Sequence, residues 1–516
     1  MKYATVFFLL FIYCTRIYGQ ASERIFRDGF CNKIITTADG GLLMLGEMET
    51  NSNENSFLMK FDSTSSVSWL KVFRDQLEFY SYGNDVVQLP GNNYLLTGMM
   101  FHDTISNEEI SLIKCDSMGN LMWAKRYGNL QQNDQAKSIL VLNDGYLLAG
   151  YTTGLGFGGE NYFIMKVDTF GNQLWSKAYG TNNDERGLFL RAYPGGFVFG
   201  GYAEAAGGTT DIFLAYLDSS ANLISTKQIE IAGNQKLTDL HVNADGSMLL
   251  LGTSYTGTNP PQAIIISISA AGAIDWCRLL TGTLGIPNAI REYLGDFIVG
   301  GHVMVWTYSE NAALIRINTS GDIVSQDYFG DSTGTTIKSF AVRGDSLFAA
   351  GYIYRPGATV PSIYFNRYLP GDSACNHYQV NNTLQPLTAT IGNPVWQVNG
   401  FSFTITSPQV VVTDILTRDS IMCDFNPMTP EIDFDRDVSV IPNPACELLY
   451  ISFPDRYSHY DLRLYDITGK MIDQYFTEEH SMTISLANIP DGIYFLHVNS
   501  KTIKGGKRII KTGNRN

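Results

Sequence analysis

The sequence predicts an all-β protein: a seven-bladed β-propeller followed by a small β element and a C-terminal immunoglobulin-like β-sandwich. Two observations lead to this prediction. A pattern of short apolar runs separated by turn residues returns about every 50 residues over the first two thirds of the chain. The last 80 or so residues alternate apolar and polar side chains, with turn signals every 8 to 12 residues. Both patterns are typical of antiparallel β architectures, and no long helical period competes with them.

The clearest copy of the repeat lies between Asn143 and Gly180. It has an apolar run at Tyr146 to Tyr151, a glycine-rich loop, and a second apolar run at Tyr162 to Val167. The turn Asp168 to Asn172 follows, and then a third run that contains Trp175. Asp and Asn bond to their own backbone and Gly accepts a positive φ, so Asp-x-x-Gly-Asn between apolar runs indicates a hairpin. The unit is therefore expected to be an antiparallel meander.

The number of blades follows from the glycine that ends the first run of each copy. Its seven occurrences, spaced by 52, 52, 50, 52, 48 and 51 residues, are Gly46, Gly98, Gly150, Gly200, Gly252, Gly300 and Gly351. A period near 50 residues with about four short strands is typical of a propeller blade, which cannot bury its faces without neighbours. The propeller is assigned to residues 20–372.

Ring closure is predicted from the two ends of this region. The seventh copy, Ser362 to Asp372, has no third strand after it, whereas Glu23 to Asp28 (ERIFRD) resembles the third strand of the first full copy, Leu70 to Asp75 (LKVFRD). We therefore expect Arg24 to Arg27 to pair with Ile363 to Tyr368 and supply the missing outer strand. When the first strand of the chain completes the last blade, hydrogen bonds between the two ends of the propeller close the ring.

The first 19 residues are predicted to be a secretory signal peptide. Lys2 precedes an apolar run from Val6 to Tyr13, and a short polar stretch ends at Gly19. Cys14 raises the alternative of a lipoprotein, but the bulky Tyr13 stands where such signals need a small residue. No later stretch reaches ~18 consecutive apolar residues, so no transmembrane anchor is expected.

Residues 373–430 fall outside the repeat and are predicted to form an appended β-rich segment. Cys375 and Cys423 lie near its two ends, and in an exported protein they are expected to form a disulfide. Cys31, Cys115 and Cys277, within the repeats, are interpreted as small buried apolar residues. Residues 431–437 are predicted to be an acidic linker. A calcium loop is the alternative there, but the bidentate carboxylate and turn glycine of such a loop are not found.

Residues 438–516 carry several separated motifs of one known family. They resemble the type A C-terminal sorting domain of the type IX (Por) secretion system of Bacteroidetes, and residues 20–372 resemble, more loosely, propeller regions of secreted proteins that carry it. The residues that match the sorting signal are Pro442, Asn443, Pro444, Gly469, Lys470, Gly492, Tyr494, Lys507 and Lys511.

The resemblance implies a partner and a destination. The type IX machinery is expected to read this domain after the propeller has reached the periplasm, and the protein is then secreted or displayed on the cell surface. In the family the signal is usually removed, and the protein is released or attached to lipopolysaccharide. The turn at Gly469 and Lys470 and the end strand with Lys507 and Lys511 are the expected contact surface, because no acidic residue follows Asp491.

The remaining sequence features argue against several chemistries. The net charge is −14, with 42 Asp and Glu against 27 Lys and Arg before residue 438, which disfavours nucleic acid as a partner. Gly154 to Gly159 fits G-x-G-x-x-G but joins two antiparallel strands, so a dinucleotide site is not expected. The seven histidines are scattered without a metal or catalytic motif. No catalytic, cofactor-binding or metal-ligating residue is therefore predicted, and no cofactor.

The sequence favours a binding, scaffolding or adhesion protein whose extracellular ligand, a protein or a glycan, meets loops on one propeller face. The alternative is a glycan-active enzyme with carboxylates grouped at the propeller channel, and a purely structural coat component is a third possibility. Paired carboxylates or a metal cage at the channel would favour the enzyme.

Overall fold

The structure is a computed structural model, and it divides into two compact units, Met1–Cys423 and Asp424–Asn516. It describes residues 22–512 except 51–52, 76–79, 103–106, 130, 155–156, 205–207, 256–260, 282–283, 306–308, 330–333, 356–357, 359, 369–376, 379–382, 396, 402–403, 407, 409, 416–419, 425–438, 443–444, 453–459, 468–469, 478, 480 and 500–503. The predicted signal peptide and the predicted acidic linker lie outside these residues. No helix in the described part is long and apolar enough to span a membrane.

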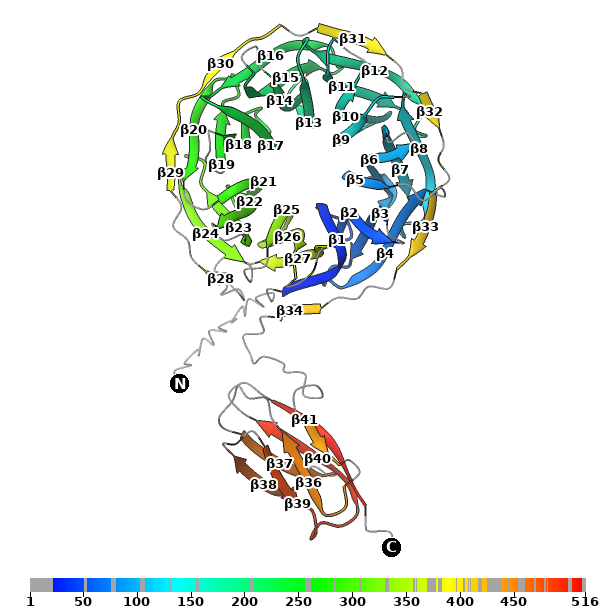
Figure 1. Cartoon of the computed structure of the whole chain (residues 1–516), viewed down its shortest axis with the longest axis vertical. Helices are drawn as coiled ribbons and strands as arrows, with labels where there is room; N and C mark the ends of the chain where they lie inside the picture. The colour runs from blue at the N-terminus through cyan, green and yellow to red at the C-terminus, as the bar shows by residue number, and fades with distance from the viewer. Residues whose placement is uncertain are drawn as a thin grey trace, which may run out of the picture. The chain divides into compact units, whose positions relative to one another are not determined.

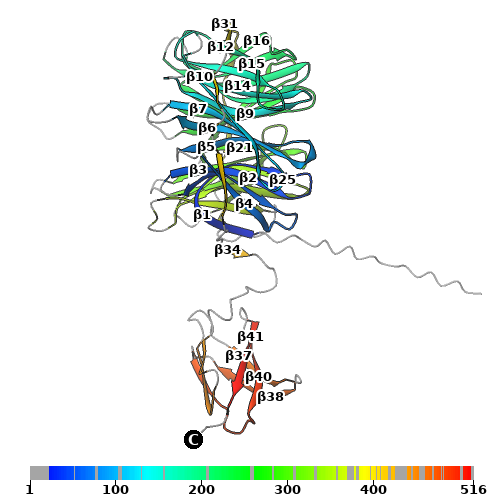
Figure 2. The same cartoon turned by 90° about the vertical axis from the view of Figure 1, so that its right-hand side faces the viewer.

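The first unit is a ring of antiparallel meanders around a central channel (Figure 1), and it is seen from its side in Figure 2. Within the described residues the meanders number seven, because five sheets hold one blade each and a sixth sheet, which contains the long strand β1, holds two. The predicted propeller is thus present. The innermost strands of the blades are β1, β5, β9, β13, β17, β21 and β25.

The propeller strands are β1 (Ser22–Thr36), β2 (Leu42–Thr50), β3 (Asn53–Phe61), β4 (Val67–Asp75), β5 (Ser81–Gln88), β6 (Tyr94–His102), β7 (Asn107–Cys115), β8 (Leu121–Gly128), β9 (Asp134–Leu142), β10 (Gly145–Thr153), β11 (Glu160–Val167), β12 (Gln173–Gly180), β13 (Glu185–Tyr193), β14 (Gly196–Glu204), β15 (Thr210–Asp218), β16 (Leu223–Glu230), β17 (Asn234–Val242), β18 (Met248–Tyr255), β19 (Gln262–Ile268), β20 (Ile274–Thr281), β21 (Leu284–Tyr293), β22 (Asp296–Val305), β23 (Ser309–Ile317), β24 (Ile323–Phe329), β25 (Thr335–Arg343), β26 (Ser346–Ile353) and β27 (Ser362–Tyr368). A short 3-10 helix, Pro90–Asn92, joins β5 to β6.

Strand β1 belongs to two blades and closes the ring. Its first half pairs with β27, from Ser22 opposite Arg367 to Asp28 opposite Ser362, and its second half pairs with β2. The predicted closure between the beginning of the chain and the last repeat is therefore confirmed.

Every innermost strand carries a β-bulge opposite a glycine of the next strand. The glycines that face the bulges are Gly46, Gly98, Gly150, Gly201, Gly252, Gly301 and Gly351. A Cβ at Gly46 would lie 1.8 Å from the carbonyl oxygen of Phe30, so only glycine fits there. In two blades the glycine that faces the bulge directly follows the repeat glycine, since Gly201 follows Gly200 and Gly301 follows Gly300.

The Asp-x-x-Gly turns form the predicted hairpins and also contact the neighbouring blade. Asp168 accepts hydrogen bonds from the amides of Phe170 and Asn172, each at 2.8 Å, and its pKa is lowered: burial acts against this, but these hydrogen bonds outweigh it. At the same turn a Cβ on Gly171 would lie 3.0 Å from the ring of Trp123, a residue of the preceding blade. The tryptophan of one blade therefore packs on the turn of the next.

After the last blade the chain runs once around the outside of the ring and adds a strand to each blade (Figure 1). We call this segment the belt. Its strands are β28 (His377–Tyr378), β29 (Thr383–Pro386), β30 (Thr390–Gly392), β31 (Gln397–Phe401), β32 (Thr404–Thr406), β33 (Val410–Asp414) and β34 (Ser420–Asp424). They pair, in the same order, with β24, β20, β16, β12, β8, β4 and β1. The sequence predicts strands here, but the structure places them along the propeller rim rather than in an element of their own.

Side chains of the belt also contact the blades. Leu387, Ala389 and Ile391 pack against a core shared by the blades of β13–β16 and β17–β20. Asp414 forms an ion pair with Lys71 at 2.6 Å. The belt thus covers the otherwise open outer edge of each blade, where unpaired backbone groups would invite another strand.

The second unit is the predicted β-sandwich. One sheet has the order β35-β36-β39 and the other β38-β37-β40-β41. The strands are β35 (Ser439–Ile441), β36 (Leu448–Ser452), β37 (Tyr460–Asp466), β38 (Met471–Thr477), β39 (Ser481–Ser485), β40 (Gly492–Asn499) and β41 (Lys504–Lys511). Its own core includes Leu449, Leu464 and Leu496, each fully buried. Alternate residues face this core, which is the pattern that the sequence shows.

Candidate functional site

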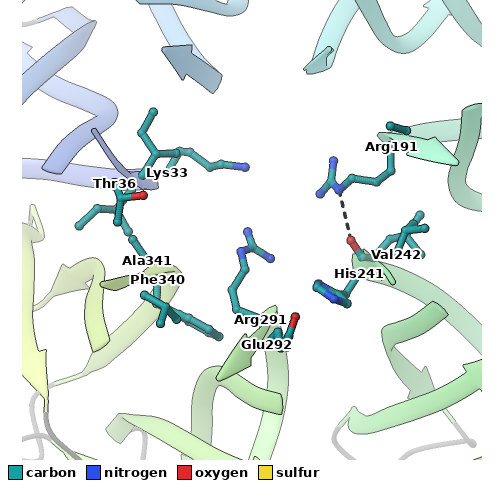
Figure 3. Close-up of a pocket in the computed structure, with 14 residues that line it drawn as sticks. Lys33, Thr36, Arg191, His241, Val242, Arg291, Glu292, Phe340 and Ala341 are labelled. Atoms are coloured by element: carbon teal, nitrogen blue, oxygen red, sulfur yellow. Dashed lines mark hydrogen bonds between the residues drawn. The ribbon is translucent and has the colours of Figure 1, made fainter. Parts of the chain in front are cut away.

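A cavity of about 510 Å³ lies in the central channel of the propeller. Its lining residues all come from five innermost strands, β1, β13, β17, β21 and β25. Lys33, Arg191 and Arg291 enter this space from three sides (Figure 3). A concave site with convergent polar groups is the usual form of a ligand site, so this channel cavity is the candidate site of the protein.

The bulges position the residues of the channel wall. In several blades the residue after the bulge contacts the next blade: Asp85 accepts from the amide of Ile139 at 2.9 Å, and Asp239 accepts from that of Ile290 at 3.0 Å. The hydroxyl oxygen of Ser339 accepts from the amide of Ile34 at 3.3 Å, across the junction of the last and first blades. These contacts join the channel wall across three of the seven blade junctions.

Asp239 is buried and binds two arginines. Arg191 lies 3.2 Å from one of its oxygens, and Arg291 bonds to the other. Burial alone would raise the pKa of Asp239, but the two guanidinium groups and the hydrogen bond from Ile290 hold it below its ordinary value. One ionised carboxylate therefore faces two permanent positive charges, and the group keeps a surplus positive charge toward the cavity.

Lys33 adds a third cation. Its ammonium group lies 3.1 Å from Asp85, and its side chain is 21% exposed. Burial lowers the pKa of Lys33, and while Asp85 acts in the opposite direction, Arg291 and Arg191 lower it further. The mutual influence of these charges shows that Lys33 and the Asp239 group belong to one electrostatic network.

His241 and Glu292 complete the ionisable lining of the cavity. The ring of His241 packs edge-on against Phe297 and its Nε2 lies 3.1 Å from the side-chain oxygen of Asn243. Burial and the nearby Arg291 lower the pKa of His241, so it is neutral at pH 7. Among acidic residues of the described chain, only Glu292 lines the cavity.

A second polar group lies on strands of the first three blades. Asn32 donates to Glu47 at 2.6 Å, Lys137 donates to Asn84 at 3.3 Å, and Lys137 lies over the ring of Tyr151. Burial raises the pKa of Glu47 to about 8, and burial lowers that of Lys137 to about 8. The described residues contain no group of three or more His, Cys, Asp or Glu that could hold a metal ion.

The three repeat cysteines are buried free thiols, as predicted: Cys31, Cys115 and Cys277. Cys375 lies outside the described residues. Cys423 is in β34, and its side chain lies outside them too. The disulfide between these two residues therefore stays a prediction.

The residues predicted for the sorting signal do not share one surface. Lys470 is exposed beside the Asp466 turn, and Pro442 is exposed, whereas Asn443, Pro444 and Gly469 lie outside the described residues. Gly492 and Tyr494 are in β40, where Tyr494 is 6% exposed and its hydroxyl donates to the carbonyl of Pro490. Its role is thus in the sandwich core.

One part of the expected positive edge is wrong. Lys507 is partly buried, but Lys511 is only 7% exposed and its ammonium group lies 3.5 Å from Asp491. The sequence shows no acidic residue after Asp491, yet β41 pairs with β40 and so brings Lys511 back beside that carboxylate. The charge of Lys511 is therefore compensated by Asp491, and Lys511 does not form part of an open basic edge.

Sequence reasoning missed the channel cations, although the repeat contains a signal for them. Arg191, His241 and Arg291 occupy the same repeat position, the third residue after the bulge, in three consecutive blades. The other four blades carry apolar residues there: Ile35, Val87, Leu140 and Ala341. A position that changes from apolar to basic residue types in part of a ring indicates a local function, and aligning the seven repeats would have exposed it.

Comparison with known proteins identifies the second unit. Residues 439–512 match the family model described as a secretion system C-terminal sorting domain. No curated protein sequence matches the chain.

Three solved structures that resemble the chain do so distantly. A putative 6-phosphogluconolactonase from Bacteroides fragilis is 13% identical, with 69% of this chain and 99% of that chain covered and a TM-score of 0.41. A protein of unknown function from Dyadobacter fermentans is 11% identical, with 68% and 100% covered and a TM-score of 0.38. PorZ, a surface component of the type IX secretion system of Porphyromonas gingivalis, is 9% identical, with 95% and 99% covered and a TM-score of 0.17. Likeness at this level carries no argument about activity.

Proposed function

This chain carries a type IX secretion system C-terminal sorting domain, and from this premise we propose that its propeller is a binding and scaffolding protein that takes an extracellular ligand at the central channel. The sorting domain directs secretion to the cell surface or the extracellular space. The function outside the cell then belongs to the propeller unit, which precedes the sorting domain in the chain. In the part described, that unit has a cavity with converging charged groups in its central channel.

The observation that carries the proposal is the state of the channel carboxylates. Asp85 and Asp239 each bind a cation and accept a backbone amide of the next blade, so both are engaged in the wall. Hydrolysis of a glycoside usually needs two carboxyl groups on either side of the bond. Glu292 is the one acidic side chain of the described residues that faces the cavity. The arrangement therefore supports recognition better than the glycan-active alternative.

The binding part is tested by filling the cavity. Ala192 is exposed in the cavity wall, so Ala192→Trp should occupy the space without removing a charge. Immobilised wild-type protein is expected to retain a partner from the outer surface and medium of the native host, and Ala192→Trp to lose it. Leu174→Trp, at an exposed position on the rim strand β12, is the control and should behave as the wild type. Equal capture by both variants would place the ligand elsewhere, and cleavage of a captured glycan would favour the enzyme.

The sorting part is tested by truncation in the native host. Removing residues 438–516 should leave the propeller in the periplasm, because the machinery no longer finds its signal. As a control, residues 424–516, which have their own core, should direct a periplasmic carrier protein to the surface or medium. Normal export of the truncated protein would contradict the assignment. After removal of the domain, we propose release or attachment to lipopolysaccharide, which cell fractionation and mass of the mature protein distinguish.

A further inference from the structure

We infer that the channel cavity binds a small ligand through an anionic oxygen group, a carboxylate or a phosphate, held chiefly by Arg291 and Lys33. The inference rests on the proposed function, since it names the chemistry of the ligand at that site.

Arg291 presents an open edge to the cavity. Its Nη1 donates to Asp239 and to the carbonyl of Ile290. In the described chain no partner accepts from its Nε or Nη2, which together form the side of the guanidinium that binds two oxygens of one group. Figure 3 shows this guanidinium in the middle of the cavity. Arg291 is thus set up for bidentate contact with a carboxylate or phosphate.

Arg191 has a different role. Its Nε donates to the carbonyl of Leu240, its Nη1 to Leu190 and Ser138, and its Nη2 to Asp239. Almost all of its donors are used by the wall. Arg191 therefore holds Asp239 and contributes charge, whereas Arg291 and Lys33 are the groups that can contact a ligand directly. The ammonium of Lys33 has Asp85 as its partner within the described residues, which leaves two of its three donors.

The guanidinium groups are held in place before any ligand binds. That of Arg291 lies 5.9 Å from the centre of the Phe340 ring, and that of Arg191 lies 5.3 Å from the centre of the Phe189 ring. Asp239 bonds to both, so neither can turn away without breaking a buried ion pair. Preorganised donors lose little entropy on binding, which favours affinity.

The charge and the size limit the class of ligand. Arg191 and Arg291 share the carboxylate of Asp239, so the open edge of Arg291 has no carboxylate of its own among the described residues. Lys33 is paired with Asp85, and Glu292 also lines the cavity, so the attraction for an anion comes from the open donors and not from a large net charge. A neutral sugar would leave these charged donors without a charged partner. A volume of about 510 Å³ suits a ligand of one or two sugar rings. The inference is therefore for an acidic sugar or a phosphorylated small molecule.

Calorimetric titration of the full chain tests this with three probes that share one ring: glucuronate, glucose 6-phosphate and glucose. Binding of glucuronate or glucose 6-phosphate, and not of glucose, is expected, and the stronger of the two tells carboxylate from phosphate. Arg291→Gln should weaken binding at least tenfold, and Lys33→Gln should weaken it less. The affinity should fall as salt rises, because exposed charges are screened.

Arg316→Gln is the matched control, because Arg316 is in the same blade, pairs with Asp296 and does not line the cavity. Thermal melting of each variant establishes that it is folded, and Lys33→Gln keeps the test open if Arg291→Gln does not fold. No binding of either anion, equal binding of glucose, or unchanged binding by both variants would overturn the inference. If Ala192→Trp still abolished capture of a native partner, the proposed function would stand and the ligand would be neutral.

Discussion

A single contact requires glycine opposite each bulge: a carbonyl oxygen approaches the place that the Cβ of any other residue would occupy. At Gly46, Gly98, Gly150 and Gly351 this approach is 1.7 to 1.8 Å, and at Gly252 it is 2.8 Å. The bulge that creates the contact also turns the next residue toward the channel, where Asp85 and Asp239 bind the following blade. The glycine of the repeat and the chemistry of the channel therefore have one geometric origin.

Gly46→Ala is expected to lower the free energy of unfolding by about 2–4 kcal/mol, because backbone must shift to relieve the overlap with Phe30. Denaturant unfolding measures it. Gly400→Ala is the control: its nearest neighbour, the carbonyl oxygen of Ser176, lies 3.9 Å from the added Cβ, so a change under about 0.5 kcal/mol is expected. Equal losses in the two variants would contradict the role given to the bulge.

Glu47 is expected to make stability fall as pH rises. Its pKa is about 8 in the folded protein, raised by burial from an ordinary 4.5. Between these values the folded state holds a proton that the unfolded state has lost, so its stability decreases with pH. Glu47→Gln should remove this dependence, and relative to the wild type its melting temperature should rise progressively from pH 5 to pH 8.

The exposed Glu49, two residues further on, gives the control for this comparison. Glu49→Gln should follow the wild type at every pH. If the melting temperatures of Glu47→Gln and the wild type differ by the same amount from pH 5 to pH 8, Glu47 does not keep its proton in the folded protein.

At the scale of elements, the belt is the part that the sequence describes least. The repeat period and the hairpin turns could be predicted, because each is set by neighbours along the chain. Belt strands such as His377–Tyr378 and Thr390–Gly392 are too short for a pattern, and their partners lie 48 to 50 and 160 to 164 residues away. Their pairing depends on the finished ring. The channel site could not be predicted for a similar reason, since Lys33 and Arg291 are far apart in the sequence and line one cavity only in the closed ring.

The predicted disulfide acquires a clear role from the belt. Cys375 comes two residues before β28, which pairs with β24. Cys423 is in β34, which pairs with β1 at the outer edge of the adjacent last blade. The bond would join the belt's two ends and close a loop of 49 residues, for which the chain-entropy model gives about 4 kcal/mol. We expect a Cys375–Cys423 peptide in a non-reducing digest of the exported protein.

Removal of the bond should lower the melting temperature of the propeller. Cys375→Ser, Cys423→Ser and the double variant should lower it by the same amount, because each removes the same bond. Cys446→Ser, at a partly buried free thiol of the second unit, should leave the propeller transition unchanged. Alkylation of Cys375 in the unreduced protein would show that the bond is not formed.

At the scale of the whole molecule, the ring is closed by the pairing of β1 with β27, and the sequence made this prediction from the similarity of two six-residue stretches. Deleting Glu23–Asp28 should lower the melting temperature of the propeller by at least about 5 °C, since the last blade loses its outer strand. Calorimetry measures the transition. Deleting six residues of the predicted linker, 431–436, is the control and should not change it. An unchanged transition after the first deletion would mean that packing alone closes the ring.

The belt has a mechanical consequence for a protein exposed outside the cell. A propeller fails when two blades separate and the ring opens outward. Here any outward movement of a blade must stretch the belt, which is hydrogen-bonded to every blade. A force at the interface between two blades is therefore distributed around the whole ring. Because the belt follows all the blades in the chain, it fastens only on a completed ring. Opening is then a cooperative event, and proteases that act on partly opened forms find few of them.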